Sequence, residues 1–141
     1  MSFMRRQGLL EGLILFGMIS ISPLQGSETP YTSAEECKTC HPSIYKYWSE
    51  STHSKAVQGE LFPVTLGRAL KLSKDQPKTR KECVGCHSPT TLATGDFELQ
   101  QAVSRQGVTC DFCHTVKDVD LDRGWSPFIV DPGPIKRGPF A

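Results

Sequence analysis

All six cysteines of the chain occur in a repeated unit, in which two cysteines are separated by two residues and followed directly by a histidine. The units are Cys37-Lys-Thr-Cys40-His41, Cys83-Val-Gly-Cys86-His87 and Cys110-Asp-Phe-Cys113-His114. This spacing is typical of covalent haem attachment, because two thiols form thioether bonds to the macrocycle while the adjacent histidine ligates the iron. The sequence therefore predicts three c-type haems, one on each unit.

Other uses of paired cysteines fit the pattern less well. A thioredoxin-like pair needs neither a following histidine nor three copies, and no βαβ pattern surrounds the units. Zinc could be held by two pairs, but the third pair would then be idle. Disulfides are common in small exported domains, but they would not explain why every pair is followed by histidine.

The chain has too few histidines to fill all the axial positions of three irons. His41, His87 and His114 would take one position on each iron, and His53 is the only other histidine. Methionine, a common alternative ligand in cytochromes c, occurs only within the first 18 residues. If that segment is removed, at most one haem can be bis-histidine within this chain. The other two irons would have open sixth positions, or would take ligands from a lysine, the new α-amine, a partner subunit or sequence beyond residue 141.

His53 follows a segment in which Ile44, Tyr47, Trp48 and Ser51 recur at helical spacing. Aromatic rings on such a helix could pack against a porphyrin face. Because His53 is the only histidine outside the units, we expect it to be a distal iron ligand, with a surface histidine as the alternative. The helix would carry it away from the first haem, so the second or the third haem is its expected target.

The sequence resembles a known family over roughly residues 35 to 116. The residues that carry the resemblance are the first unit with Tyr45, Trp48 and Ser51-Thr-His53, the second unit, and the run Gly107-Val-Thr-Cys110. They are similar to the cytochrome c-554/c-552 type domain shared with hydroxylamine oxidoreductase-like multihaem cytochromes. The resemblance implies a mostly α-helical, loop-rich domain that packs haems in close pairs, carries electrons in the periplasm, and uses the histidine at the position of His53 as a distal ligand to another haem. Relatives carry more haems and continue past a segment like residues 138–140, so we expect a short or truncated member.

Local patterns indicate which elements position the units. Ser33 with Glu36, and Thr79 with Glu82, form capping patterns that predict helix starts just before the first two units. Cys110 follows His87 by 23 positions, which favours neighbouring second and third haems.

Between the second and third units, Asp96 is expected to cap a helix that carries Leu99, Ala102 and Val103 on one face and stops at Gly107. No strand pattern stands out, and no regular element is expected after Gly124. The basic residues that precede the second unit predict either a solvated loop beside haem propionates or a docking patch for an acidic redox partner; they are Lys71, Lys74, Lys78, Arg80 and Lys81.

The amino-terminal segment has the layout of a secretory signal peptide. Arg5 and Arg6 precede an apolar run over residues 12–21, and Gly26 stands near the expected cleavage site. The run is shorter than the roughly 20 residues that a membrane-spanning helix needs. We therefore expect residues 1–26 to be removed and the protein to reach the bacterial periplasm, with membrane attachment only if the leader stays uncleaved.

Removal of the leader would leave 115 of the 141 residues, with 14 basic and 14 acidic side chains. This balance gives no support to nucleic-acid binding, which calls for a basic excess. We expect a trihaem cytochrome c domain over residues 27–117 and a Pro/Gly-rich extended tail over 118–141. The predicted fold is mainly α with extensive irregular loops, scaffolded by the haems because so short a chain cannot build a large core of its own.

The preferred function is an electron carrier between a redox protein donor and acceptor, because a haem does the redox chemistry while the protein positions it. The alternative is a subunit or fragment of a multihaem oxidoreductase that acts on a small nitrogen or sulfur compound at an open haem iron. A haem sensor or assembly component is a third interpretation. The sequence assigns no catalytic side chain.

Overall fold

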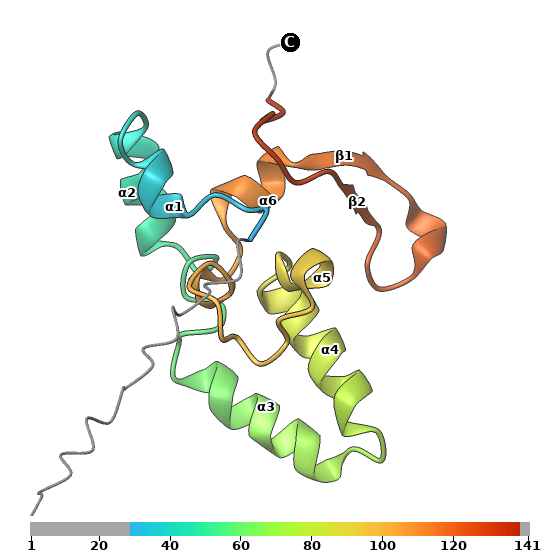
Figure 1. The fold of residues 1–141 in the computed structure, drawn as a ribbon. Helices are drawn as coiled ribbons and strands as arrows, with labels where there is room; N and C mark the ends of the chain where they lie inside the picture. Colours follow the sequence, from blue (N-terminus) through green and yellow to red (C-terminus); the bar gives the residue numbers. More distant parts are fainter. Residues whose placement is uncertain (1–28, 139–141) are drawn as a thin grey trace, which may run out of the picture.

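Short helices joined by loops make up most of the computed structural model, which describes residues 29–138 (Figure 1). The elements are α1 (Ala34–Cys37), α2 (Pro42–Glu50), α3 (Leu61–Leu72), α4 (Gln76–His87), α5 (Thr91–Thr94), η1 (Ser104–Gln106), α6 (Cys110–His114), β1 (Val116–Val119), η2 (Leu121–Arg123) and β2 (Phe128–Val130). The predicted class, mainly α with extensive irregular loops, is confirmed. The leader expected over residues 1–26 lies outside the described residues.

The first helix begins where the sequence pattern predicted. The Ser33 hydroxyl accepts a hydrogen bond of 3.2 Å from the N–H of Glu35 and caps α1. The chain then turns, and Pro42 starts α2, because a proline at the first helical position has no N–H to leave unpaired. α2 contains Ile44, Tyr47 and Trp48 of the helical segment that was predicted to precede His53, and Ser51 caps its carboxyl end.

α3 and α4 pack against each other and form the lower end of the molecule in Figure 1. The helix before the second unit was predicted to start at Thr79, and this start is wrong. Asp75 caps α4 instead, because its Oδ1 accepts a hydrogen bond of 3.0 Å from the N–H of Lys78, and Pro77 follows in the first turn. Thr79 lies inside the helix, and α4 carries the whole second unit at its carboxyl end.

The α-helix predicted to run from Asp96 to Gly107 is also wrong. The Asp96 carboxylate accepts hydrogen bonds from the N–H groups of Gln100 and Gln101, at 2.9 and 2.7 Å. Between them Leu99 has a φ of 56°, a left-handed conformation that a right-handed helix cannot contain. Only the short 3₁₀ turn η1 forms before Gly107 ends the segment at a φ of 73°.

Two strands form after the third unit, although none was expected. β1 and β2 pair antiparallel, with Val116 opposite Val130 and Val119 opposite Phe128. Their three or four residues are too few for a clear alternating pattern, which explains why the sequence did not reveal them. The expectation of no regular element after Gly124 is therefore wrong.

Among residues 29–138, the protein has only a small apolar interior. Its buried hydrophobic side chains are Tyr31, Ala34, Val57, Phe62, Val84, Val103 and Phe112, and an equal number of polar residues is buried with them. Larger groups such as Ile44, Leu61, Trp125 and Phe128 stay exposed. This distribution fits a domain in which bound cofactors complete the core. Within the described part of the chain, no helix is long and apolar enough to cross a membrane.

Candidate haem sites

Each unit presents its second cysteine and its histidine at the surface. The first unit lies at the end of α1 and in the turn before α2, the second ends α4, and the third forms the whole of α6. The exposed side chains are Cys40, Cys86 and Cys113 with His41, His87 and His114. All six cysteines lie within residues 29–138 and have free thiols, as thioether attachment requires. Within the same residues, no three His, Cys, Asp or Glu side chains gather as a site for a free metal ion.

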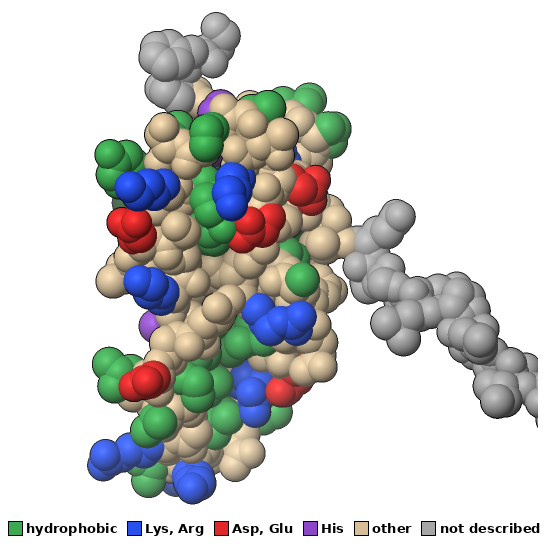
Figure 2. Space-filling model, turned by 90° about the vertical axis from the view of Figure 1, so that its left-hand side faces the viewer, with side chains coloured by type: hydrophobic (Ala, Val, Ile, Leu, Met, Phe, Trp, Pro, Cys, Tyr) green, Lys and Arg blue, Asp and Glu red, His purple; other side chains and the backbone are tan. Residues whose placement is uncertain are grey.

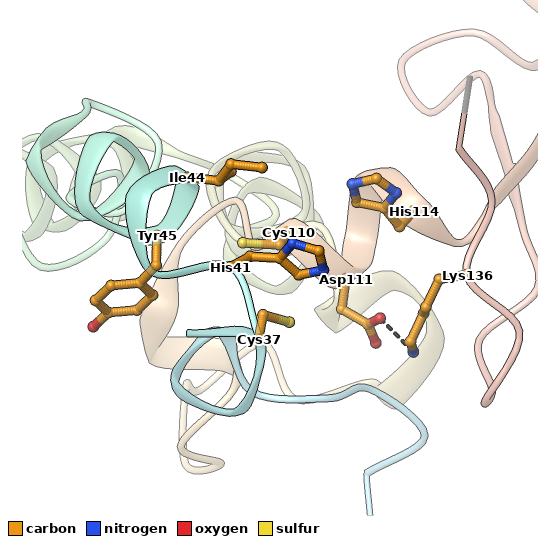
Figure 3. Close-up of a pocket in the computed structure, with 8 residues that line it drawn as sticks. All are labelled: Cys37, His41, Ile44, Tyr45, Cys110, Asp111, His114 and Lys136. Carbon is orange, nitrogen blue, oxygen red and sulfur yellow. Dashed lines mark ion pairs between the residues drawn. The ribbon is translucent and has the colours of Figure 1, made fainter. Parts of the chain in front are cut away.

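The first and third units share a cavity of about 220 Å³ between α1 and α6 (Figure 3). Cys37, His41, Cys110 and His114 line it together with Ile44, Tyr45, Asp111 and Lys136. Burial raises the pKa of the Cys110 thiol, and the adjacent Cys37 raises it further. The pKa of Cys37 is raised by burial and by the nearby Asp111 carboxylate. Because both units line this cavity, the two attachment sites lie side by side.

The second and third units also meet. Cys86 and Cys113 line one cavity of about 450 Å³, together with His53, Trp125 and Phe128. The short separation of these units along the chain predicted that they would be neighbours. Trp125 packs against the second unit, because a Cβ placed on Gly85 would lie 2.9 Å from the Trp125 ring. The third unit thus lies between the other two.

Two of the unit histidines are held in the tautomer that an iron ligand needs. Nδ1 of His87 lies 3.0 Å from the carbonyl oxygen of Ala56, and Nδ1 of His114 lies 2.5 Å from that of Arg137. A carbonyl can only accept, so Nδ1 carries the proton in each ring and Nε2 is left to bind metal. The ring of Phe62 also packs on His87, with centroids 4.7 Å apart. These side chains fit a haem iron.

The loop that carries His53 is joined to the residues before the third unit. Val108 donates its N–H to the His53 carbonyl at 3.0 Å, and Trp48 donates its indole N–H to the Val108 carbonyl at 2.8 Å. Gly107 has a φ of 73°, and a Cβ there would overlap the His53 carbonyl. Thr109 then caps α6 through a hydrogen bond of 3.2 Å from the N–H of Phe112. The sequence marked Gly107 as a helix stop and as part of the family resemblance, but it did not reveal this contact or Thr109 as a cap.

His53 is exposed and borders two cavities. One is the cavity it shares with Cys86 and Cys113. The other, of about 840 Å³, is lined by His53, Phe62, Cys86 and His87 among others. The structure therefore places His53 beside the second and third units, as expected from its position after α2.

Sequence reasoning missed a buried charge in the third unit. Asp111 is 1% exposed, accepts a hydrogen bond of 2.7 Å from the N–H of Thr32, and forms an ion pair with Lys136. The dashed line in Figure 3 marks this pair at the edge of the shared cavity. An aspartate between two cysteines gave no signal of burial, and the partner lies 25 residues further along the chain.

Residues 36–115 match the family model for cytochrome c554 and c-prime. The chain belongs to this family. As a c-type cytochrome of the cytochrome c554 and c-prime family, it binds haem covalently and takes part in electron transfer with redox partners. The resemblance to the cytochrome c-554 type is thus confirmed, whereas the link to hydroxylamine oxidoreductase-like proteins stays a prediction. Neither a search of curated proteins nor one of solved structures found a match.

Proposed function

We propose that this cytochrome is a periplasmic electron carrier that holds three haems, one on each unit. His41, His87 and His114 would be the ligands on the attachment side. The observation that supports this most strongly is the place of the third unit, whose Cys110 borders the first unit and whose Cys113 borders the second. Sites that share cavities in this order would let an electron pass from one to the next.

The protein's own residues supply binding and orientation. When bound, the haems supply one-electron redox chemistry. The exposed cysteines would fix each macrocycle, and the carbonyls of Ala56 and Arg137 orient two of the ligand rings. The exposed Ile44, Leu61, Trp125 and Phe128 line the cavities, and a porphyrin would cover this apolar surface.

We further propose that His53 is the distal ligand of the second or the third haem, because it borders the cavities of both units. Two irons then take a sixth ligand other than a histidine or methionine of the mature chain. A partner subunit, a lysine or the new α-amine could supply it, or the position could be open.

The alternative, an oxidoreductase site for a small nitrogen or sulfur compound, has one favourable feature. Tyr45 and Lys136 line the cavity of the first and third units, and such groups can bind an oxyanion. However, the Tyr45 hydroxyl donates to Glu35, and Lys136 is paired with Asp111. Because both groups already have partners within the chain, we favour the carrier.

Haem content and iron spin state test this proposal. The full chain, produced in a bacterium that attaches c-type haem, should show the mass of three haems. Its electron paramagnetic resonance spectrum should show the bis-histidine low-spin signal from one haem and different signals from the other two. His53→Ala should remove the bis-histidine signal, while Thr52→Ala, an exposed neighbour at the same cavity, should keep it. Fewer than three haems, or three bis-histidine irons, would refute the assignment. Rapid turnover of nitrite or hydroxylamine would reverse the ranking of the two functions.

Export is tested separately by cell fractionation and amino-terminal sequencing. We expect the haem protein in the periplasmic fraction, with Ser27 as its first residue. A product that keeps Met1 and stays with the membrane would show instead that the leader is an uncleaved anchor.

A further inference from the structure

The segment that follows β2 crosses back over α6 and contacts the third unit. Asp131 donates its N–H to the Thr115 carbonyl at 2.8 Å, and Arg137 donates its N–H to the His114 carbonyl at 2.6 Å. The Arg137 guanidinium bonds to the Asp131 carboxylate at 2.7 Å, which closes the segment on itself. We name residues 131–137 the strap.

The strap holds His114 at both its backbone and its ring. Arg137 donates to the His114 carbonyl and accepts from the His114 Nδ1 at 2.5 Å. The corresponding acceptor for His87 is Ala56, which lies within the residues that match the family model. Arg137 lies beyond residue 115, where that match ends. The ring orientation at the third unit therefore depends on residues outside the family's shared region.

The strap also places a positive charge next to the buried Asp111. Asp111 is 1% exposed and is turned toward the cavity shared with the first unit, and the Lys136 ammonium is its ion-pair partner (Figure 3). A buried charge without a partner is strongly unfavourable. Lys136 is further held by a hydrogen bond of 2.7 Å to the Gly133 carbonyl, so its position is fixed by the strap.

We propose that the strap sets the reduction potential of the haem on Cys110 and Cys113, by orienting His114 and by neutralising Asp111 through Lys136. The inference rests on the proposed function at one point, namely that the third unit carries a haem. Lys136 compensates the charge of Asp111, and Arg137 positions His114. Hydrogen bonds to a ligand ring and nearby charges are established means of tuning a haem.

The direction of the effect follows from charge. Without Lys136, the negative charge of Asp111 is uncompensated and favours the more positive ferric iron. At a fixed ambient potential, the ratio of reduced to oxidised third haem in Lys136→Met should therefore fall about tenfold, equivalent to a drop of about 59 mV for a one-electron couple.

The experiment follows each haem separately in a redox titration of the full haem protein, by paramagnetic nuclear magnetic resonance with haem signals assigned through their thioether links. Lys136→Arg keeps the charge and should match the natural protein. The double variant Asp111→Asn/Lys136→Met removes both charges and should recover most of the loss. Lys117→Met removes an exposed positive charge on β1 and should shift the ratio much less.

Two outcomes would count against the inference in different ways. If mass spectrometry shows three attached haems but Lys136→Met leaves the third haem's reduced-to-oxidised ratio unchanged, the strap does not set its potential. If the natural protein carries no haem on Cys110 and Cys113, the proposed function fails, and the inference falls with it. An equal shift in Lys117→Met would also overturn it, because the effect would then not depend on Asp111.

Discussion

The backbone carbonyl of His53 accepts a hydrogen bond of 3.0 Å from the N–H of Val108. This bond joins two segments 55 residues apart, the loop after α2 and the approach to α6. The Trp48 indole N–H donates a hydrogen bond to the Val108 carbonyl. The two sequence elements that made the family resemblance specific, around Trp48 and Gly107, are therefore in contact with each other.

Gly107→Ala should destabilise the protein and displace His53. Its backbone, with φ 73° and ψ −134°, costs an alanine roughly 1–3 kcal/mol, and the added Cβ would overlap the His53 carbonyl. We expect a lower unfolding midpoint together with an altered spectrum of the haem that we propose His53 ligates. Gly124→Ala is the matched control, because Gly124 has nearly the same backbone angles, with φ 71° and ψ −128°, but nothing within 4 Å of the added carbon. It should show the backbone cost alone, and equal effects of the two variants would contradict the role of the contact.

Trp48→Phe removes the hydrogen bond of 2.8 Å from the indole to the Val108 carbonyl. The partly buried carbonyl would then lack this partner, at a cost of about 1–3 kcal/mol in the free energy of unfolding. Chemical denaturation followed by haem absorbance measures this change. Tyr47→Phe, on a side chain that is 74% exposed, should change it by less than about 0.5 kcal/mol. Comparable losses in both variants would contradict the role of the indole donor.

Asp96 should make the stability of the 96–107 segment dependent on pH. Burial tends to raise its pKa, but the N–H groups of Gln101 and Gln100 bind the charged form and hold the pKa below its usual range. Its stabilisation is therefore complete above the ordinary aspartate value of about 4 and is lost as the pH falls through the lower folded value. Because hydrogen bonds to a charged acceptor are stronger than those to a neutral one, the natural protein should be about 1 kcal/mol more stable than Asp96→Asn at pH 7, and the difference should vanish in strong acid. A difference that stays constant with pH would exclude this role of the carboxylate.

The basic residues of α3 and α4 should steer anionic redox partners. Residues 61–82 contain six basic and two acidic side chains, and Figure 2 shows Lys and Arg together with hydrophobic side chains at this end of the molecule. Arg80 is paired with Glu98 at 3.0 Å, whereas Lys71 and Lys78 are exposed. Lys71→Glu/Lys78→Glu should slow oxidation of the reduced protein by hexacyanoferrate(III) several-fold at low salt, and the difference should shrink as salt screens it.

Lys46→Glu/Lys117→Glu is the control for this measurement, since it changes the net charge equally at exposed positions on α2 and β1. It should slow the reaction less. If both double variants behave alike, only the overall charge is important, and the basic run is a solvated surface.

Replacing all six cysteines by serine should abolish cooperative folding. The described residues bury few hydrophobic side chains, of which Phe62 and Phe112 are among the largest, so the haems would have to supply most of the apolar interior. Thermal unfolding followed by circular dichroism should show no sharp transition in this variant. A cooperative transition would show that the polypeptide folds without its cofactors.

Patterns carried by neighbouring residues could be interpreted from the sequence, and contacts between distant segments could not. The haem units, the cap at Ser33 and the helix before His53 each depend on local spacing. The cap at Asp75 was missed because Thr79 with Glu82 matched a familiar pattern four residues later, and the helix after Asp96 failed because one leucine adopts a positive φ. The pairing of the first and third units, and the burial of Asp111, arise only when α1 meets α6 in space.

The third unit is a five-residue helix, α6, that takes part in both shared cavities. If electrons travel through the protein, they must pass through the third unit to move between the first and the second. Losing the haem on the first or the second unit would shorten the route. Losing the haem on α6 would leave two isolated cofactors. A substitution of Arg137 or Lys136, which lie far from the first two units in the sequence, would therefore impair electron transfer through the third unit, and with it transfer between the first and second units.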